Sequence, residues 1–384
     1  MGEINTVNKA KPQGPADQFL PLLASSPHIA SPVNSAALMK NMLIALGPVS
    51  IYGIAIFGLP ALLNIAVSVL AAIIAEALFR LLTKQQARVG DFSAGVTGLL
   101  LALIIPPSTP LWMTALGAIF AVIVAKEFFG GLGANVFNPA LIGRAFLLMS
   151  FPADLTTWHQ PQRGFVLRLT ESMTGAGLVD GISGVTPLSL IKTGAGLEAV
   201  GKFFGAAGLS SSDSYWSTIK TLFVGFRAGC TGETSILLIL AAFIFLLVTK
   251  TIDWRAPVSM TAAAFLCSLV LGLDPLFSVL SGGLLFGAVF MATDYVTSPL
   301  TARGKILFGI GAGIISILIR KWGTYPEGVS YSILIMNGVT PFLNKLLPRK
   351  YGFRPKKKPA AAPKAPGPAA PTAASAPSSA EAAK

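Results

Sequence analysis

The polar middle of the chain holds the residues with the clearest chemical potential, in the string Asp180-Gly181-Ile182-Ser183-Gly184-Val185-Thr186-Pro187-Leu188. Pro187 biases the preceding Thr186 towards an extended backbone, and the Ser183-Gly184 pair favours a turn just before it. The pattern predicts an accessible threonine hydroxyl, with the Asp180 carboxylate upstream. Spacing alone, however, favours a simpler interpretation, a turn that ends a loop.

Several carboxylates form a second group, because they lie near or inside long apolar runs. They are Glu76, Asp91, Glu127, Asp274 and Asp294. Ionisable groups are costly in hydrocarbon, so each is a candidate for a Na⁺ or H⁺ route. For Asp91, Asp274 and Asp294, which lie near the ends of runs, we favour helix capping or solvation. Glu76 and Glu127 lie within a turn or two of Arg80 or Lys126, so local ion pairs remain an alternative.

Cysteine and histidine add little chemistry. Cys230 and Cys267 lack CxxC spacing and nearby histidines, and His28 and His159 stand alone in their segments. Metal and iron–sulfur sites need several such ligands close together. The sequence therefore predicts no catalytic residue and no metal site, and we expect both cysteines to be small buried residues.

A glycine-rich run, residues 130–133, is followed by Asn135, Asn138 and Pro139. No strand is expected before this run, so a phosphate-binding loop is the weaker interpretation. We expect a broken helix at the cytoplasmic face, whose freed backbone groups line a cavity.

Composition indicates that the bilayer is the solvent of this chain. Of its 384 residues, 53% are hydrophobic and only 12% are charged, which is about half the charged share of an ordinary soluble domain. The net charge of +13 comes from Lys and Arg at the ends of apolar runs and in the C-terminal tail, where basic residues set membrane orientation. We therefore do not expect nucleic-acid binding.

Apolar runs that could span a bilayer, some of them only with help from interfacial residues, fall into two sets. The first set covers residues 40–58, 60–82, 93–106, 111–126 and 137–151, and the second covers residues 233–250, 257–273, 276–292, 305–320 and 328–346. The sequence therefore predicts an all-α polytopic membrane protein with about ten transmembrane helices.

The two sets of runs resemble each other, which suggests two repeated five-helix halves. The matching positions are Pro110 with Pro275, Gly117 with Gly282, and Asn138-Pro139 with Ser298-Pro299. Repeats of this kind commonly place a pathway at their interface. We favour duplication over chance similarity between glycine-rich helices.

Basic residues decide the predicted orientation. Most of them lie on one side if both termini are cytoplasmic, and Arg320 and Lys321 are the main exceptions. Trp158 and Trp216, near the ends of the external loop, are predicted interfacial anchors. The organisation is then a cytoplasmic N-terminal segment (1–39), a first transmembrane half (40–151), an external loop (152–215), a second transmembrane half (216–347) and a disordered basic cytoplasmic tail (348–384).

The string around Thr186 resembles the flavinylation motif of the RnfD and NqrB family, Asp-x-x-Ser-Gly-x-Thr followed by Pro-Leu. The resemblance extends from about Ser25 to Gly352, and the short N-terminal segment favours the RnfD branch. It also includes Ser25-Ser26-Pro27-His28, Pro106-Pro107, Pro110-Leu111-Trp112, the segment from Lys126 to Ala140, Met291-Ala292-Thr293-Asp294 and Tyr325-Pro326-Glu327-Gly328.

This resemblance implies a subunit of an ion-pumping complex in the bacterial inner membrane that passes electrons between ferredoxin and NAD. It implies that a flavin transferase joins FMN through its phosphate to Thr186, with Asp180, Ser183, Pro187 and Leu188 around the attachment point. The NAD site, the iron–sulfur centres and a second bound flavin are then expected on partner subunits. A noncovalent flavin such as riboflavin between the two halves is a further expectation.

Two residues depart from the family pattern. Val185 stands where alanine is usual, and Tyr295 stands where proline usually follows Thr-Asp. The first could slow flavin attachment, and the second could alter the loop between spans eight and nine.

Two other functions stay open, a transporter or channel for a small solute or ion and a colourless scaffold subunit. Neither needs a threonine that is presented to a flavin transferase.

Overall fold

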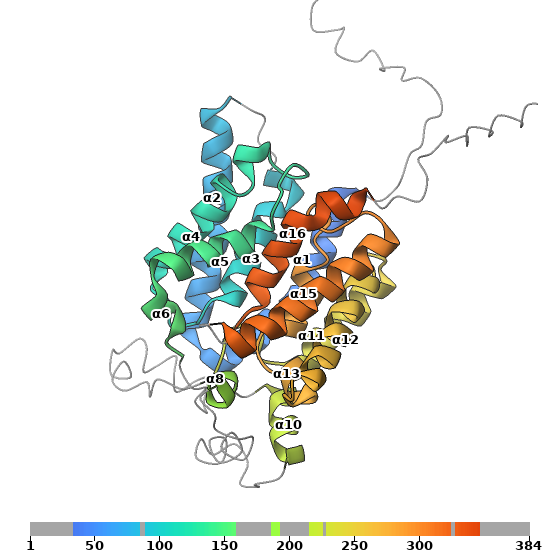
Figure 1. Ribbon diagram of the computed structural model, residues 1–384. Coiled ribbons are helices and arrows are strands. Elements are labelled where there is room, and N and C mark those ends of the chain that lie inside the picture. The colour runs from blue at the N-terminus through green and yellow to red at the C-terminus, as the bar shows by residue number, and fades with distance from the viewer. Residues whose placement is uncertain are drawn as a thin grey trace, which may run out of the picture. The chain divides into compact units, whose positions relative to one another are not determined.

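A computed structural model describes residues 34–84, 89–158, 186–192, 215–225, 228–323 and 327–345, and among these residues it contains helices and no strand (Figure 1). The chain divides into two compact units, Met1–Leu346 and Leu347–Lys384. All described residues belong to the first unit. The predictions for most of the N-terminal segment and for the tail therefore lie outside the described residues.

Four helical stretches in the described part of the chain are long and apolar enough to cross a bilayer. They are α1 (Ser35–Phe57), α2 (Leu59–Leu82), the stretch Leu111–Phe129, which contains α4 (Leu111–Ile123) and the short η3 (Glu127–Phe129), and α15 (Ala302–Trp322). Their composition makes the chain an all-α membrane protein, as predicted.

Five further helices coincide with predicted apolar runs but are shorter, at 12 to 16 residues. They are α3 (Ser93–Ile104), α5 (Pro139–Ser150), α11 (Ile236–Val248), α12 (Arg255–Val270) and α16 (Val329–Asn344). A straight span needs about 20 residues, so length alone does not assign these helices as full spans.

The eighth predicted run is broken. It forms α13 (Pro275–Leu280), α14 (Leu284–Phe286) and the π-helical η4 (Gly287–Met291). Gly282, with φ of 66°, turns the chain between α13 and α14, a conformation that favours glycine. Its sequence partner Gly117 instead lies inside the continuous α4. The two halves therefore differ at this pair.

The ends of α2 and α11 match each other closely. A threonine caps the C-terminus of each helix, Thr83 after α2 and Thr249 after α11, and its hydroxyl donates to the carbonyl four residues earlier. The next residue is a lysine in the left-handed region, with φ of 54° at Lys84 and 53° at Lys250. Non-glycine residues seldom adopt this conformation, so the shared helix ending is a specific likeness between the halves.

Small residues allow α12 and α15 to pack closely. A Cβ atom added to Gly313 would lie 2.4 Å from the carbonyl oxygen of Met260, and one added to Gly309 would lie 2.6 Å from that of Ala256. Glycines at such positions let two membrane helices bring their backbones together. This contact joins two helices of the second half.

Between α5 and α11 the chain contains short helices that the sequence analysis did not predict, α6 (Pro152–Thr156), α8 (Pro187–Lys192) and α10 (Tyr215–Val224). Trp216 is exposed, as expected for an interfacial anchor. The same prediction for Trp158 is wrong, because its side chain is 7% exposed and packs against Ala228 and Cys230. A side chain that is covered by protein does not face the interface.

We predict that Gly313→Ala lowers the thermal unfolding temperature of the detergent-solubilised protein, because the added methyl group forces α12 and α15 apart. Overpacking of this kind costs about 1–3 kcal/mol. Gly47→Ala in α1 is the control, since nothing lies within 4 Å of its added Cβ. Equal unfolding temperatures for the two variants would contradict the close packing.

Candidate functional site

The Thr186 segment lies at one end of the helix bundle. Thr186 immediately precedes α8, which lies at the same end as α13 and the C-terminal end of α15 (Figure 1). The predicted neighbours Asp180 and Ser183 lie outside the described residues. Thr186 is only 5% exposed, so the prediction of an accessible hydroxyl is wrong for this conformation.

Two contacts dock α8, which begins directly after Thr186, onto the bundle. The Leu188 side chain reaches the turn at Gly282, where it lies 3.6 Å from the position of an added Cβ. The Lys192 ammonium donates to the carbonyl oxygen of Gly323, just beyond α15. Partial burial lowers the pKa of Lys192. Both contacts join residues far apart in sequence, so local turn propensity did not reveal them.

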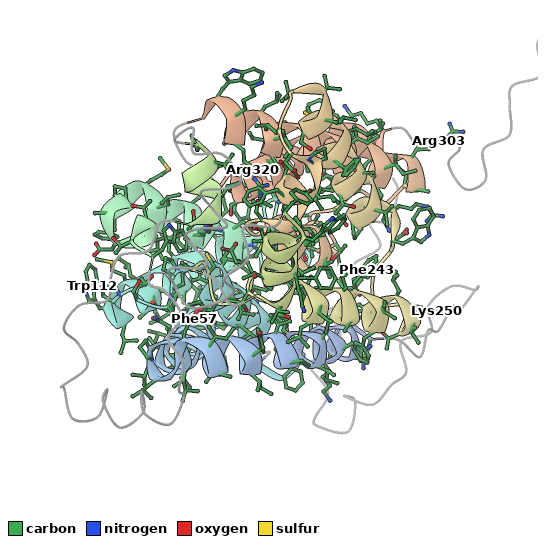
Figure 2. All side chains as sticks on the ribbon, turned by 90° about the horizontal axis from the view of Figure 1, so that it is seen from below. Phe57, Trp112, Phe243, Lys250, Arg303 and Arg320 are labelled. Carbon is green, nitrogen blue, oxygen red and sulfur yellow. The ribbon has the colours of Figure 1, made fainter. Side chains whose placement is uncertain are left out.

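Arg320 is a buried cation beside this segment. Its guanidinium donates to the carbonyl oxygen of Ser281 at 3.1 Å and to that of Ser278. The guanidinium also lies 3.1 Å from the position that a Cβ atom added to Gly282 would take, the position that Leu188 also faces. The broken helix frees the carbonyl groups that hold it. Arg320 was an exception in the predicted orientation, and its burial explains how a basic residue is accommodated there (Figure 2).

Glu76 and Glu127, two of the ion-route candidates, belong to a buried ion-pair network. Glu76 pairs with Arg80 at 3.0 Å and with Lys126 at 3.1 Å, while Glu127 pairs with Arg80 at 3.2 Å. Lys126 also donates to the Ser93 hydroxyl at 2.6 Å. Two carboxylates and two cations balance one another. The ion-pair alternative is confirmed, although Glu127 pairs with Arg80 rather than with its neighbour Lys126.

The three remaining carboxylates each accept a local hydrogen bond. Asp274 caps α13 by accepting from the backbone N–H of Phe277 at 2.7 Å, as predicted. Asp91 accepts from the Ser93 backbone N–H at 2.9 Å, and Asp294 accepts from the Thr297 hydroxyl at 2.9 Å. Asp294 differs from the other two because it also lines a cavity.

This cavity lies where the glycine-rich run predicted one. Asn138 caps α5 by accepting from the Ala140 backbone N–H at 3.1 Å, and with Asn135 it lines a space shared by the two halves. The volume of this cavity is about 50 Å³. The other lining residues include Met39, Met42, Lys126, Phe290, Asp294 and Tyr295.

A second polar cluster was missed by the sequence analysis. Arg144 of α5 pairs with Glu327 and donates to the Ser330 hydroxyl at 3.1 Å. The Cys230 backbone N–H donates to the Glu233 carboxylate at 3.0 Å. Ligand atoms of Cys230, Glu233 and Glu327 lie within 4.8 Å of one another. Spacing in the sequence could not predict this cluster, because Arg144 and Glu327 are 183 residues apart. The one sequence signal for it was Glu233, an ionisable residue at the start of an apolar run.

Comparison with known proteins identifies the family. The family model described as NQR2, RnfD, RnfE matches residues 22–352. The chain belongs to this family. Its match covers all the helices that the structure describes, so the resemblance noted for the flavinylation motif is confirmed at the level of the family.

Family members that resemble the chain along most of its length are D subunits of membrane complexes. That of the proton-translocating ferredoxin:NAD(+) oxidoreductase complex of Clostridium ljungdahlii is 38% identical over 340 residues, 86% of this chain and 96% of that protein. That of the Na(+)-translocating ferredoxin:NAD(+) oxidoreductase complex of Acetobacterium woodii is 39% identical, covering 88% and 98%. That of the ion-translocating oxidoreductase complex of Stutzerimonas stutzeri is 36% identical, covering 85% and 95%.

We predict that Glu76→Gln destabilises the protein by about 3 kcal/mol or more, because it leaves buried cations with too little negative charge. Adding Lys126→Met to Glu76→Gln should recover much of this loss, since both partners are then neutral. Thermal unfolding in detergent measures both variants, with Lys345→Gln as an exposed control. A double variant less stable than Glu76→Gln would contradict the charge-balance argument.

Proposed function

We propose that this chain is the D-type membrane subunit of an ion-translocating ferredoxin:NAD oxidoreductase complex, that it carries FMN on Thr186, and that electron transfer through this flavin is coupled to movement of Na⁺ or H⁺. The observation that carries the proposal is the combination of two likenesses. The chain resembles D subunits along most of its length, and it holds the string from Asp180 to Leu188.

The residues around Thr186 fit a phosphate-linked cofactor. Thr186 offers a hydroxyl that can form a phosphate ester, and Arg320 and Lys192 are cations next to its segment. Cations favour a bound phosphate. FMN, when bound, supplies one- and two-electron transfer, and the role of Thr186 is to tether it. Because the hydroxyl is buried, the flavin transferase must act before α8 docks or while it is displaced.

A noncovalent flavin such as riboflavin is proposed for the cavity at Asn135 and Asn138. Three features of this cavity support the proposal: the amide side chains of Asn135 and Asn138, the position between the predicted halves, and the apolar walls. Such features are typical of small-molecule sites. The open space of about 50 Å³ is smaller than a flavin ring system. Binding therefore requires side chains such as Met39 and Met42 to move apart.

For the ion route, Asp294 is the favoured carboxylate of the four proposed, Glu76, Glu127, Asp91 and Asp294. Glu76 and Glu127 form ion pairs with Arg80 and Lys126, whereas Asp294 lines the cavity between the predicted halves. The relatives are named for different ions, a proton in one and Na⁺ in another. The proposal therefore covers both ions.

The proposed setting is the bacterial inner membrane, with both termini cytoplasmic, the Thr186 loop external and about ten spans in two repeated halves. The distribution of Lys and Arg supports the orientation, and the matched endings of α2 and α11 support the duplication. Partner subunits would supply the iron–sulfur, NAD and second flavin sites, and a separate transferase would attach FMN.

A small-solute transporter or channel, or a colourless scaffold, is the alternative function. Broken helices such as the one at Gly282 suit a solute pathway too. Neither alternative would carry a covalent flavin, so colour separates them from the proposed function.

We predict that Thr186→Ala abolishes the ultraviolet-excited flavin fluorescence of the denatured protein band, because no hydroxyl remains to form the ester. The protein is expressed with its flavin transferase, and the unfolding temperature of the variant should stay close to that of the unchanged protein. Thr186→Ser is the matched control and should retain fluorescence, since its hydroxyl occupies a similar position. Fluorescence in the alanine variant would refute Thr186 as the attachment site.

A further inference from the structure

A basic cavity opens beside the turn between α11 and α12, and Tyr295 lines both this cavity and the one at Asn135 and Asn138. The volume of the basic cavity is about 500 Å³, and it lies between this turn and residues 292–305. Three cations line it, Lys250, Arg255 and Lys305, together with a single carboxylate, Asp253. Figure 2 shows Lys250 and the exposed Arg303 on the same side of the bundle.

Asp253 organises two of these cations. It accepts from the Arg255 guanidinium at 2.8 Å and from the Lys305 ammonium at 3.1 Å. Burial raises the pKa of the Asp253 carboxyl, but the hydrogen bonds from Arg255 and Lys305 outweigh burial and hold this pKa below its ordinary value. Asp253 is therefore ionised at neutral pH. Among the lining residues, three positive charges face one negative charge, so the cavity attracts an anion.

Two exposed apolar side chains also line the basic cavity. Trp254 is 52% exposed and Leu300 is 76% exposed, and both line the cavity. Tryptophan is typical of the membrane–water interface. A soluble anion would gain nothing from these side chains, whereas a ligand that joins an anionic head to hydrocarbon would use the cations and the two apolar side chains together.

We propose that the basic cavity binds the phosphate of an anionic phospholipid, with Lys250 and Lys305 as the cations that face the headgroup and with Trp254 and Leu300 beside the acyl chains. The leaflet is the cytoplasmic one, because the proposed orientation puts most basic residues on that side. Basic pockets at the ends of membrane helices recognise lipid headgroups in this way. The proposal depends on this orientation and is independent of flavin attachment.

The test measures lipid binding to the purified complex by native mass spectrometry, during titration with phosphatidylglycerol or phosphatidylcholine in neutral detergent. Phosphatidylglycerol should bind more tightly, and Lys250→Gln should weaken it by about fivefold. Lys84→Gln is the matched control, because Lys84 is exposed at an equivalent helix ending but does not line the basic cavity. It should leave the affinity unchanged.

Further measurements distinguish the proposed phospholipid from other ligands of the basic cavity. Lys250→Arg should keep the preference for phosphatidylglycerol, which guards against a simple loss of folding in the glutamine variant. Equal affinity for the two lipids, or equal losses in Lys84→Gln and Lys250→Gln, would overturn the proposal. So would displacement of phosphatidylglycerol by millimolar inorganic phosphate, which indicates a free-anion site, or by a partner subunit, which indicates a protein interface.

Discussion

The fold depends on one constraint, that polar and charged groups in a membrane protein must find partners inside the protein because hydrocarbon offers none. A charge-balanced network meets this constraint with Glu76, Arg80, Lys126 and Glu127. The break at Gly282 meets it differently, since Arg320 takes up the carbonyl groups that the interrupted helix leaves free. Removing one partner from either arrangement leaves the others exposed to a medium of low polarity.

The same constraint links the fold to the proposed chemistry. Arg320 binds carbonyl groups of the broken helix, and Leu188 lies at the same turn, at Gly282. The segment that carries Thr186 therefore meets the helix bundle beside a buried cation. A phosphate ester formed at Thr186 would therefore lie near positive charge. The cavity at Asn135 and Asn138 is lined by residues from both predicted halves.

Local patterns in the sequence predicted local structure well. Apolar runs located the longer helices, and position near a run end predicted the cap that Asp274 forms on α13. Long-range contacts could not be predicted in this way. The pairing of Arg144 with Glu327 joins distant segments, and the burial of Thr186 depends on how α8 docks. Trp158 illustrates the same limit, because only the fold determines whether a tryptophan at a loop end meets lipid or protein.

Mass spectrometry of the peptide that contains Thr186 tests the central claim most directly. The protein is expressed with a flavin transferase that is active on a known substrate, and the peptide is isolated from the purified protein. The account predicts that the mass of an esterified FMN is added to Thr186. An unmodified peptide under these conditions would contradict the account and favour a transporter or a colourless scaffold.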